Sequence, residues 1–131
     1  RMARVRVVPN QSHDRFLALM RLADAVLDPT HFNGMNNSLD AFSVGTPVVT
    51  LPRTFQRGRH TYGMYRCMGL DHCVASSEDD YVRIAARLGR ESDFRQAVSR
   101  DIVERSTLLF EDARVVREFE RFFEESLECA R

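Results

Sequence analysis

The residues best suited to chemistry follow the second short apolar run of the chain. Gly34 permits a backbone turn that other residues resist. Asn36, Asn37 and Ser38 then open a predicted helix, where free N–H groups and the positive end of the helix dipole favour an anion. Asp40 comes one turn later, within reach of the hydroxyls of a sugar attached to that anion. This spacing predicts a site for a phosphate and a ribose.

A second interpretation of the same stretch is a solvated loop that caps the following helix. Asp40 would then only complement the helix dipole. The stretch is not the dinucleotide-binding fingerprint, because the chain contains no G-x-G-x-x-G sequence. Both interpretations stay open on the pattern alone.

Other polar residues give weaker signals. A loop after the third apolar run is basic and could neutralise a phosphate, although such a loop is more often merely solvated; it holds Arg53, Arg57, Arg59 and His60. His31 follows a predicted strand and is most simply a surface or capping residue. Cys67 and Cys73 lack the spacing of metal ligands, and no G-x-S-x-G sequence is present. We therefore expect no metal site and name no catalytic residue.

The elements that must position these residues alternate along the chain. Short apolar runs predict strands at residues 5–8, 25–27, 47–51 and 73–75. Helical spacing of apolar residues predicts helices at 12–23, 39–44, 62–68, 81–88, 92–102 and 112–127. The pattern predicts one α/β domain over residues 1–131, with a Rossmann-like parallel sheet, helices on both faces and a helical C-terminal tail. Ligands of such sheets bind beyond the carboxyl ends of the strands, where the candidate residues fall.

The composition narrows the class of protein. The 131 residues carry 19 basic and 19 acidic side chains, so the net charge is zero and neither nucleic acid nor a membrane surface is an expected partner. All the basic residues are arginines, which excludes lysine chemistry within this chain. The apolar runs are too short to cross a membrane. Three sparse cysteines favour a reducing compartment, so we expect a cytoplasmic protein.

Several segments resemble a known family. Residues 23–28, 31–41 and 45–52 are similar to the C-terminal catalytic region of the O-linked GlcNAc transferase and SPINDLY family, and 57–59, 68–70 and 108–110 also match. The resemblance implies part of a GT-B glycosyltransferase, namely the distal part of the lobe that binds the nucleotide sugar. It implies a set of donor-binding residues, namely Gln11, His13, Gly34, Asn36, Asn37, Ser38 and Asp40.

By this resemblance, residues 36–38 would hold the diphosphate, Asp40 would bind the ribose hydroxyls, and Gln11 and His13 would border the uracil. The family often has threonines in place of Asn36 and Asn37, and asparagine keeps hydrogen-bond donors there. It often has His or Gly where Met35 stands, and methionine does not supply a histidine's hydrogen bonds.

The implied function is binding of UDP-GlcNAc or a UDP-hexose by an inverting protein O-glycosyltransferase, with a protein acceptor and no metal or other cofactor. A GDP-sugar is also open, because some relatives use one. The alternative is a non-catalytic α/β module, for nucleotide binding or protein interaction, whose site has decayed. A carboxylate at Asp40 favours the first, because a decayed site has no need of it.

The resemblance also implies that these residues form a fragment. The family's lobe has two further strands with a glutamine and a lysine that hold the diphosphate, and a second lobe that contacts the acceptor. We therefore expect the chain alone to be inactive. Two responses to the missing strands are open: residues 5–8 pair beside residues 25–27, or two copies exchange elements in a homodimer, which we favour.

Overall fold

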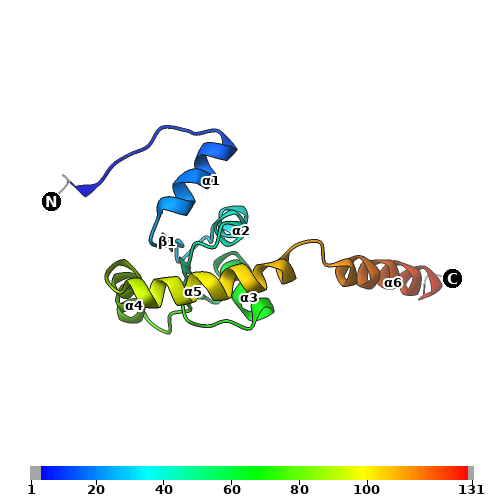
Figure 1. Cartoon of the computed structure of the whole chain (residues 1–131). Coiled ribbons are helices and arrows are strands. Elements are labelled where there is room, and N and C mark those ends of the chain that lie inside the picture. The colour runs from blue at the N-terminus through cyan, green and yellow to red at the C-terminus, as the bar shows by residue number, and fades with distance from the viewer. Residues whose placement is uncertain (1–3, 130–131) are drawn as a thin grey trace.

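The computed structural model describes residues 4–129 of the chain. The elements in order are α1 (His13–Leu22), β1 (Val26–Leu27), α2 (Met35–Ser43), β2 (Val48–Val49), the short 3₁₀ turn η2 (Gln56–Gly58), α3 (His60–Met68), α4 (Glu78–Arg90), α5 (Ser92–Arg105), the 3₁₀ turn η3 (Ser106–Leu109) and α6 (Ala113–Cys129). Helices surround a small parallel sheet in the body of the molecule, as Figure 1 shows for β1. The α/β class is confirmed, with more helix and less strand than the sequence predicts.

The sheet is parallel and short. Val26 lies opposite Val48 and Leu27 opposite Val49, so β1 and β2 run side by side. One further parallel bridge joins the residue after β2, Thr50, to residue 74. The predicted strands at residues 47–51 and 73–75 are therefore present only as a two-residue strand and a single bridge.

A side chain explains why the third strand is so short. The Tyr65 hydroxyl accepts a hydrogen bond from the Val48 N–H at 3.0 Å and donates one to the Val48 carbonyl at 2.9 Å. These are the two backbone groups of Val48 that a neighbouring strand would otherwise satisfy. Tyr65 from α3 thus completes the sheet where another strand could have paired, and periodicity in the sequence gives no sign of this substitution.

The strand predicted at residues 5–8 is wrong. Val5, Val7 and Val8 are 65%, 92% and 54% exposed and form no strand, and this segment runs along the outside of the molecule (Figure 1). Strand preference is mostly packing against neighbours, and no strand lies beside these valines in residues 4–129. The interpretation in which they pair beside residues 25–27 is therefore also wrong.

The core lies between the sheet and α2, α3, α4 and α5. Phe42 of α2 and Tyr65 of α3 pack edge to face with ring centroids 4.9 Å apart, and both are almost fully buried. Two valines of β2 and the aliphatic side chains Ile84, Leu88, Val98 and Ile102 complete its centre. This core fixes α2, and α2 carries most of the predicted site.

Two helix ends are fixed by local contacts. Gly45 follows α2 with a φ of +79°, and a Cβ there would lie 2.6 Å from a methyl group of Val103, so only glycine fits. The Ser77 hydroxyl accepts from the Asp80 N–H at 3.1 Å at the start of α4. Asp80 in turn accepts from the Ser76 N–H, which lowers the pKa of its carboxyl together with Arg83.

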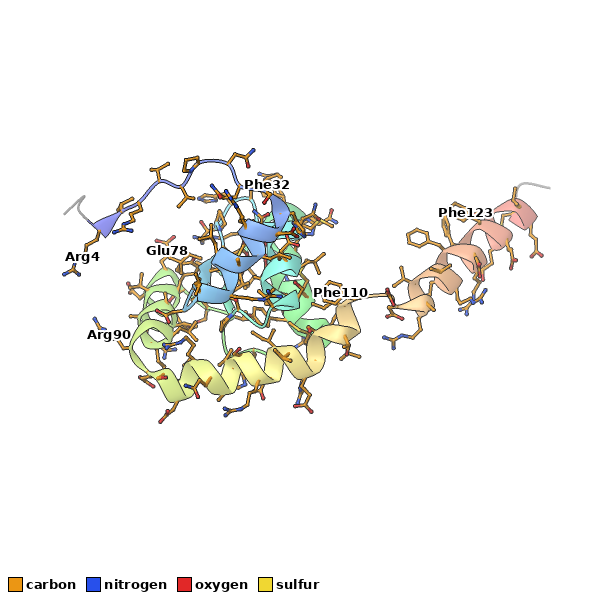
Figure 2. The ribbon with its side chains drawn as sticks, turned by 45° about the horizontal axis from the view of Figure 1, so that its top comes forward. Arg4, Phe32, Glu78, Arg90, Phe110 and Phe123 are labelled. Carbon is orange, nitrogen blue, oxygen red and sulfur yellow. The ribbon has the colours of Figure 1, made fainter. Side chains whose placement is uncertain are left out.

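The predicted C-terminal helix is present as α6, and none of its described side chains is buried. Its apolar face is exposed and consists of Val115, Val116, Phe119, Phe122, Phe123 and Leu127. Figure 2 shows α6 extending from the body, with Phe123 far from the other helices. Its strongly sided pattern of apolar residues is typical of a helix that packs against another surface.

Candidate functional site

The loop between β1 and α2 is held by hydrogen bonds at both ends. At one end, Asp28 follows β1 and its Oδ1 accepts from the Gly34 N–H at 2.9 Å. At the other, the Asn33 N–H donates to the Arg57 carbonyl at 2.7 Å, and the Asn33 side chain donates to the Pro29 carbonyl at 3.0 Å. Asp28 and Asn33 are both 2% exposed. The loop that leads into α2 therefore has a defined shape.

The first turn of α2 presents free backbone donors. The helix begins at Met35, and the Ser38 N–H is the first that donates within it, to the Gly34 carbonyl. The N–H groups of Met35, Asn36 and Asn37 make no hydrogen bond to any described residue, and these three residues are exposed. Sequence spacing places the free donors at residues 37–39; they lie two residues earlier because α2 begins before residue 39. A helix start with three free N–H groups is suited to an anion.

Ser38 is more buried than the other residues on α2 that are predicted to bind the donor. Its side chain is buried, and its hydroxyl is 2.8 Å from Thr61 Oγ1 on α3. This contact joins α2 to α3 inside the protein. The Ser38 hydroxyl is thus engaged with the core rather than exposed beside Asn36 and Asn37.

Asp40 lies in the second turn of α2 with a side chain that is 26% exposed. Its Oδ1 is 3.9 Å from Nε2 of His13, the first residue of α1. The two form an ion pair when the imidazole is protonated. The carboxylate is therefore accessible and lies opposite a predicted base-binding residue.

A groove of about 560 Å³ lies between the N-terminal segment, α1 and α2. Its lining consists of Val8, Pro9, Asn10, Gln11, His13, Phe16, Leu19, Asn37 and Asp40. The groove thus brings Gln11 and His13 together with Asn37 and Asp40, and these two pairs are far apart in the sequence. Gly34 lies at the N-cap of α2, and Asn36 is beside Asn37; neither lines the groove itself.

The two sides of this groove differ in how they are fixed. Gln11 donates from Nε2 to the Pro9 carbonyl at 2.8 Å, a contact within the N-terminal segment. On the other side, α2 is anchored by Phe42 in the core and by the Ser38–Thr61 contact. One side therefore depends on a local hydrogen bond and the other on the core.

The basic loop is held by local contacts outside the groove. Arg53 lies 2.7 Å from Glu78 at the start of α4, and Arg59 donates to the Arg53 carbonyl at 3.1 Å. The guanidinium of Arg57 lies 4.6 Å from the centre of the Phe55 ring. In this arrangement the three arginines contact neighbouring residues of the protein, and none of them lines the groove.

Two residues near the site were not singled out from the sequence. Asp28 and Thr50 follow β1 and β2, and the Thr50 hydroxyl donates to Asp28 Oδ2 at 2.8 Å. Their position directly after two apolar runs is a usable signal, because the carboxyl ends of parallel strands meet at one edge.

Over residues 4–129, no three or more His, Cys, Asp or Glu side chains are gathered as a metal site would require. No helix in that range combines the length and apolar character needed to cross a membrane. Cys67 and Cys129 are exposed and Cys73 is buried, all as free thiols.

Comparison with known proteins gives consistent matches. Residues 2–117 match the family model described as Glycosyl transferase family 41. The chain is 36% identical over 73 residues to a UDP-N-acetylglucosamine--peptide N-acetylglucosaminyltransferase of Caenorhabditis elegans, a match that covers 56% of this chain and 6% of that protein. It is 28% identical over 85 residues to the probable UDP-N-acetylglucosamine--peptide N-acetylglucosaminyltransferase SPINDLY of Eustoma exaltatum subsp. russellianum. That match covers 65% of this chain and 9% of the other protein.

The fold matches a solved structure as well. A mutant of the Thermobaculum terrenum O-GlcNAc transferase superposes with a TM-score of 0.80 and 26% sequence identity. The match covers 95% of this chain and 25% of that one. The chain thus spans less than a tenth of the length of the two curated relatives and a quarter of the solved structure.

Proposed function

The chain belongs to glycosyl transferase family 41, and on that premise we propose that it is part of the nucleotide-sugar-binding lobe of an inverting protein O-glycosyltransferase with the GT-B arrangement. The donor is a UDP-sugar, UDP-GlcNAc or a UDP-hexose, and the acceptor is a protein. The Caenorhabditis elegans relative is named for transfer of N-acetylglucosamine to a peptide, which supports this choice. Three free cysteines suit a reducing compartment, and the proposal places the protein in the cytoplasm.

The groove lined by Gln11, His13, Asn37 and Asp40 is the main observation that supports this proposal. Gln11 and His13 border the uracil, Asp40 accepts hydrogen bonds from the ribose hydroxyls, and Asn37 lies between these residues and the helix start. A volume of about 560 Å³ suits a nucleoside. The base, the sugar and the phosphates of one nucleotide would then meet consecutive parts of a single surface.

The diphosphate lies at the start of α2. The N–H groups of Met35, Asn36 and Asn37 and the side-chain amides of the two asparagines donate to it. Negative charge grows on the diphosphate as the sugar departs, so donors and a helix dipole already aimed at it stabilise the transition state. In this proposal these groups neutralise the leaving diphosphate without a metal ion.

The experiment is titration calorimetry of the purified protein with UDP and, separately, with uridine. Binding of both, with UDP the tighter, is the expected result, because only UDP reaches the start of α2. A protein that binds neither contradicts the proposal.

A non-catalytic module is the second candidate, and the Ser38–Thr61 contact favours it. A hydroxyl engaged in the core leaves one predicted phosphate donor fewer. Such a module binds UDP but transfers no sugar to any acceptor, so a transfer assay with UDP-GlcNAc on a complete glycosyltransferase that contains these residues separates the two candidates. We expect no transfer by these 131 residues alone in either case.

We also propose that the chain forms a homodimer. β1 pairs with β2 along one edge only, and no strand lies along its other edge in residues 4–129. Leu27 of β1 is 57% exposed, and the valines of residues 5–8 are exposed as well. An unpaired edge is a template for another chain. Light scattering tests this, and a single species at the chain mass of 15.1 kDa contradicts it.

A further inference from the structure

Asp28 is the point at which three parts of the fold meet. Its N–H donates to the Val49 carbonyl at 3.0 Å, which continues the pairing of β1 with β2. Its carbonyl accepts from the Tyr81 hydroxyl of α4 at 3.0 Å. Its carboxylate accepts from the Gly34 N–H at 2.9 Å and from the Thr50 hydroxyl at 2.8 Å. One residue thus joins the sheet, α4 and the loop that leads into α2.

The carboxylate is buried with no cation beside it. Asp28 is 2% exposed and Thr50 is fully buried, and none of the ion pairs in residues 4–129 includes Asp28. Burial of a carboxylate without a cation is unfavourable, so the donors around it must compensate. Each oxygen has one: a backbone N–H for Oδ1 and a hydroxyl for Oδ2. The arrangement therefore holds the loop at one defined distance from the end of β2.

The bond to Gly34 determines which backbone donors stay free. Gly34 is the N-cap of α2, and its N–H points inward to Asp28. The next three N–H groups, of residues 35–37, then belong to the first turn and have no partner among residues 4–129. A Cβ at Gly34 would lie 3.3 Å from the Asn37 Cβ, so the cap and the first turn are closely packed. A shift of Gly34 would therefore move the three free donors together.

We infer that Asp28 is a positioning residue for the diphosphate: through Gly34 it sets the place and direction of the N–H groups at the start of α2. This inference rests on the proposed function. Asp28 touches no substrate itself, because it lies beneath the loop. Its effect should fall on the phosphates and spare the uridine, which lies in the groove next to Gln11, His13 and Asp40.

The test compares UDP and uridine affinities in three variants by calorimetry. Asp28→Ala removes both acceptors and should weaken UDP binding about tenfold or more, the scale for leaving a buried donor unpaired, with uridine binding within about twofold of the wild type. Asp28→Asn keeps one oxygen for Gly34, and its amide can donate to Thr50 because a hydroxyl also accepts. This conservative variant should restore UDP binding to within about threefold of the wild type.

Thr50→Val is the milder variant, in case Asp28→Ala does not fold. It keeps the carboxylate and its bond to Gly34 but removes the second anchor. We expect an intermediate loss of UDP affinity, about threefold, again without loss of uridine affinity. Thermal melting of each variant records stability separately from binding.

The outcomes separate the two ideas. A wild type that binds neither UDP nor uridine overturns the proposed function and this inference with it. A wild type that binds UDP, with variants that keep its ratio of UDP to uridine affinity, overturns this inference alone. Equal losses in Asp28→Asn and Asp28→Ala also overturn it, because the shape of the side chain would then not matter.

Discussion

The two sides of the groove are built in different ways. On the α2 side, Asn37 and Asp40 stand on a helix whose inner face holds Phe42 in the core and Ser38 against Thr61. On the N-terminal side, Val8 is 54% exposed and Gln11 is held by one hydrogen bond within its own segment. The α2 side is thus preformed. On the N-terminal side, few contacts within the protein hold the residues that line the groove.

The two sides of the groove are therefore suited to different parts of the proposed nucleotide. A preformed helix start suits the diphosphate, because transition-state stabilisation needs donors that are already in place. A segment with few internal contacts suits the base, where adjustment is less costly to the chemistry. The predictions below weaken one side at a time, from the largest expected effect to the smallest.

Loss of the core beneath the α2 side should have the largest effect. Phe42→Ala leaves a cavity against Tyr65 and should lower the free energy of unfolding by about 3–5 kcal/mol. Chemical denaturation measures this. Phe55→Ala, at a phenylalanine that is 63% exposed, is the matched control and should change stability by less than about 0.5 kcal/mol. Equal losses in the two variants would mean that α2 is not anchored as described.

High pH should weaken the same core. Burial raises the pKa of the Cys73 thiol to about 11 from its ordinary value of 9.0. The unfolded chain therefore releases this proton first as the pH rises, and the stability that is present below pH 9 is lost between pH 9 and 11, by about 2–3 kcal/mol. Burial also raises the pKa of Tyr65, which adds to the loss in the same direction.

Unfolding free energies measured from pH 7 to 11 test this, with Cys73→Ala as the comparison. The variant should show a shallower decline above pH 9. An identical decline in both proteins would assign the alkaline loss to other groups.

Removal of the carboxylate on the α2 side should affect binding more than folding. Asp40→Ala should weaken UDP binding by about 1.5–3 kcal/mol, the scale for a hydrogen bond to a charged group. Asp79→Ala, an exposed carboxylate in the first turn of α4, is the matched control and should leave UDP affinity unchanged. Unchanged UDP affinity in Asp40→Ala would show the ribose assignment to be wrong.

Loss of the Gln11 amide on the N-terminal side of the groove should weaken binding less than loss of Asp40. Gln11→Ala removes one hydrogen bond within the exposed N-terminal segment and the proposed contact to the base. We therefore expect about 0.5–1.5 kcal/mol weaker binding of both UDP and uridine. The melting temperature should stay the same. A fall in stability would show that this segment is anchored more firmly than its exposure indicates.

The smallest effect is expected at Val7, which is 92% exposed. Val7→Ser should change the free energy of unfolding by less than about 0.5 kcal/mol. A larger loss would mean that the valines of residues 5–8 are covered in solution, and that the proposed homodimer buries them as well as the edge of β1. The measurement is best repeated at several protein concentrations, because only a dimer gives a concentration-dependent result.

The same contrast explains which features the sequence could predict. A helix start close to Asn36 and Asn37 follows from local chemistry, so neighbouring residues suffice to predict it, and α2 begins at Met35. The strand at residues 5–8 was wrong because strand formation needs a neighbour that a run of valines does not specify.

Contacts between residues that are far apart in the sequence could not be predicted either. The partner of Ser38 is Thr61, which lies 23 positions later, so the sequence could not show that the hydroxyl is buried. The role of Asp28 was missed for the same reason, because its partner Thr50 lies 22 positions away. Type and spacing indicate which residues could bind a ligand, but packing decides which of them face it.

The Tyr65 hydroxyl that caps Val48 also bears on the behaviour of the protein at high concentration. Because both backbone groups of Val48 are already bonded, that edge of β2 offers nothing to a strand from another molecule. The outer edge of β1 has no such cover in residues 4–129, with Leu27 largely exposed. Aggregation through the sheet should therefore be one-sided, and a charged residue in place of Leu27 would protect the edge that the tyrosine leaves open.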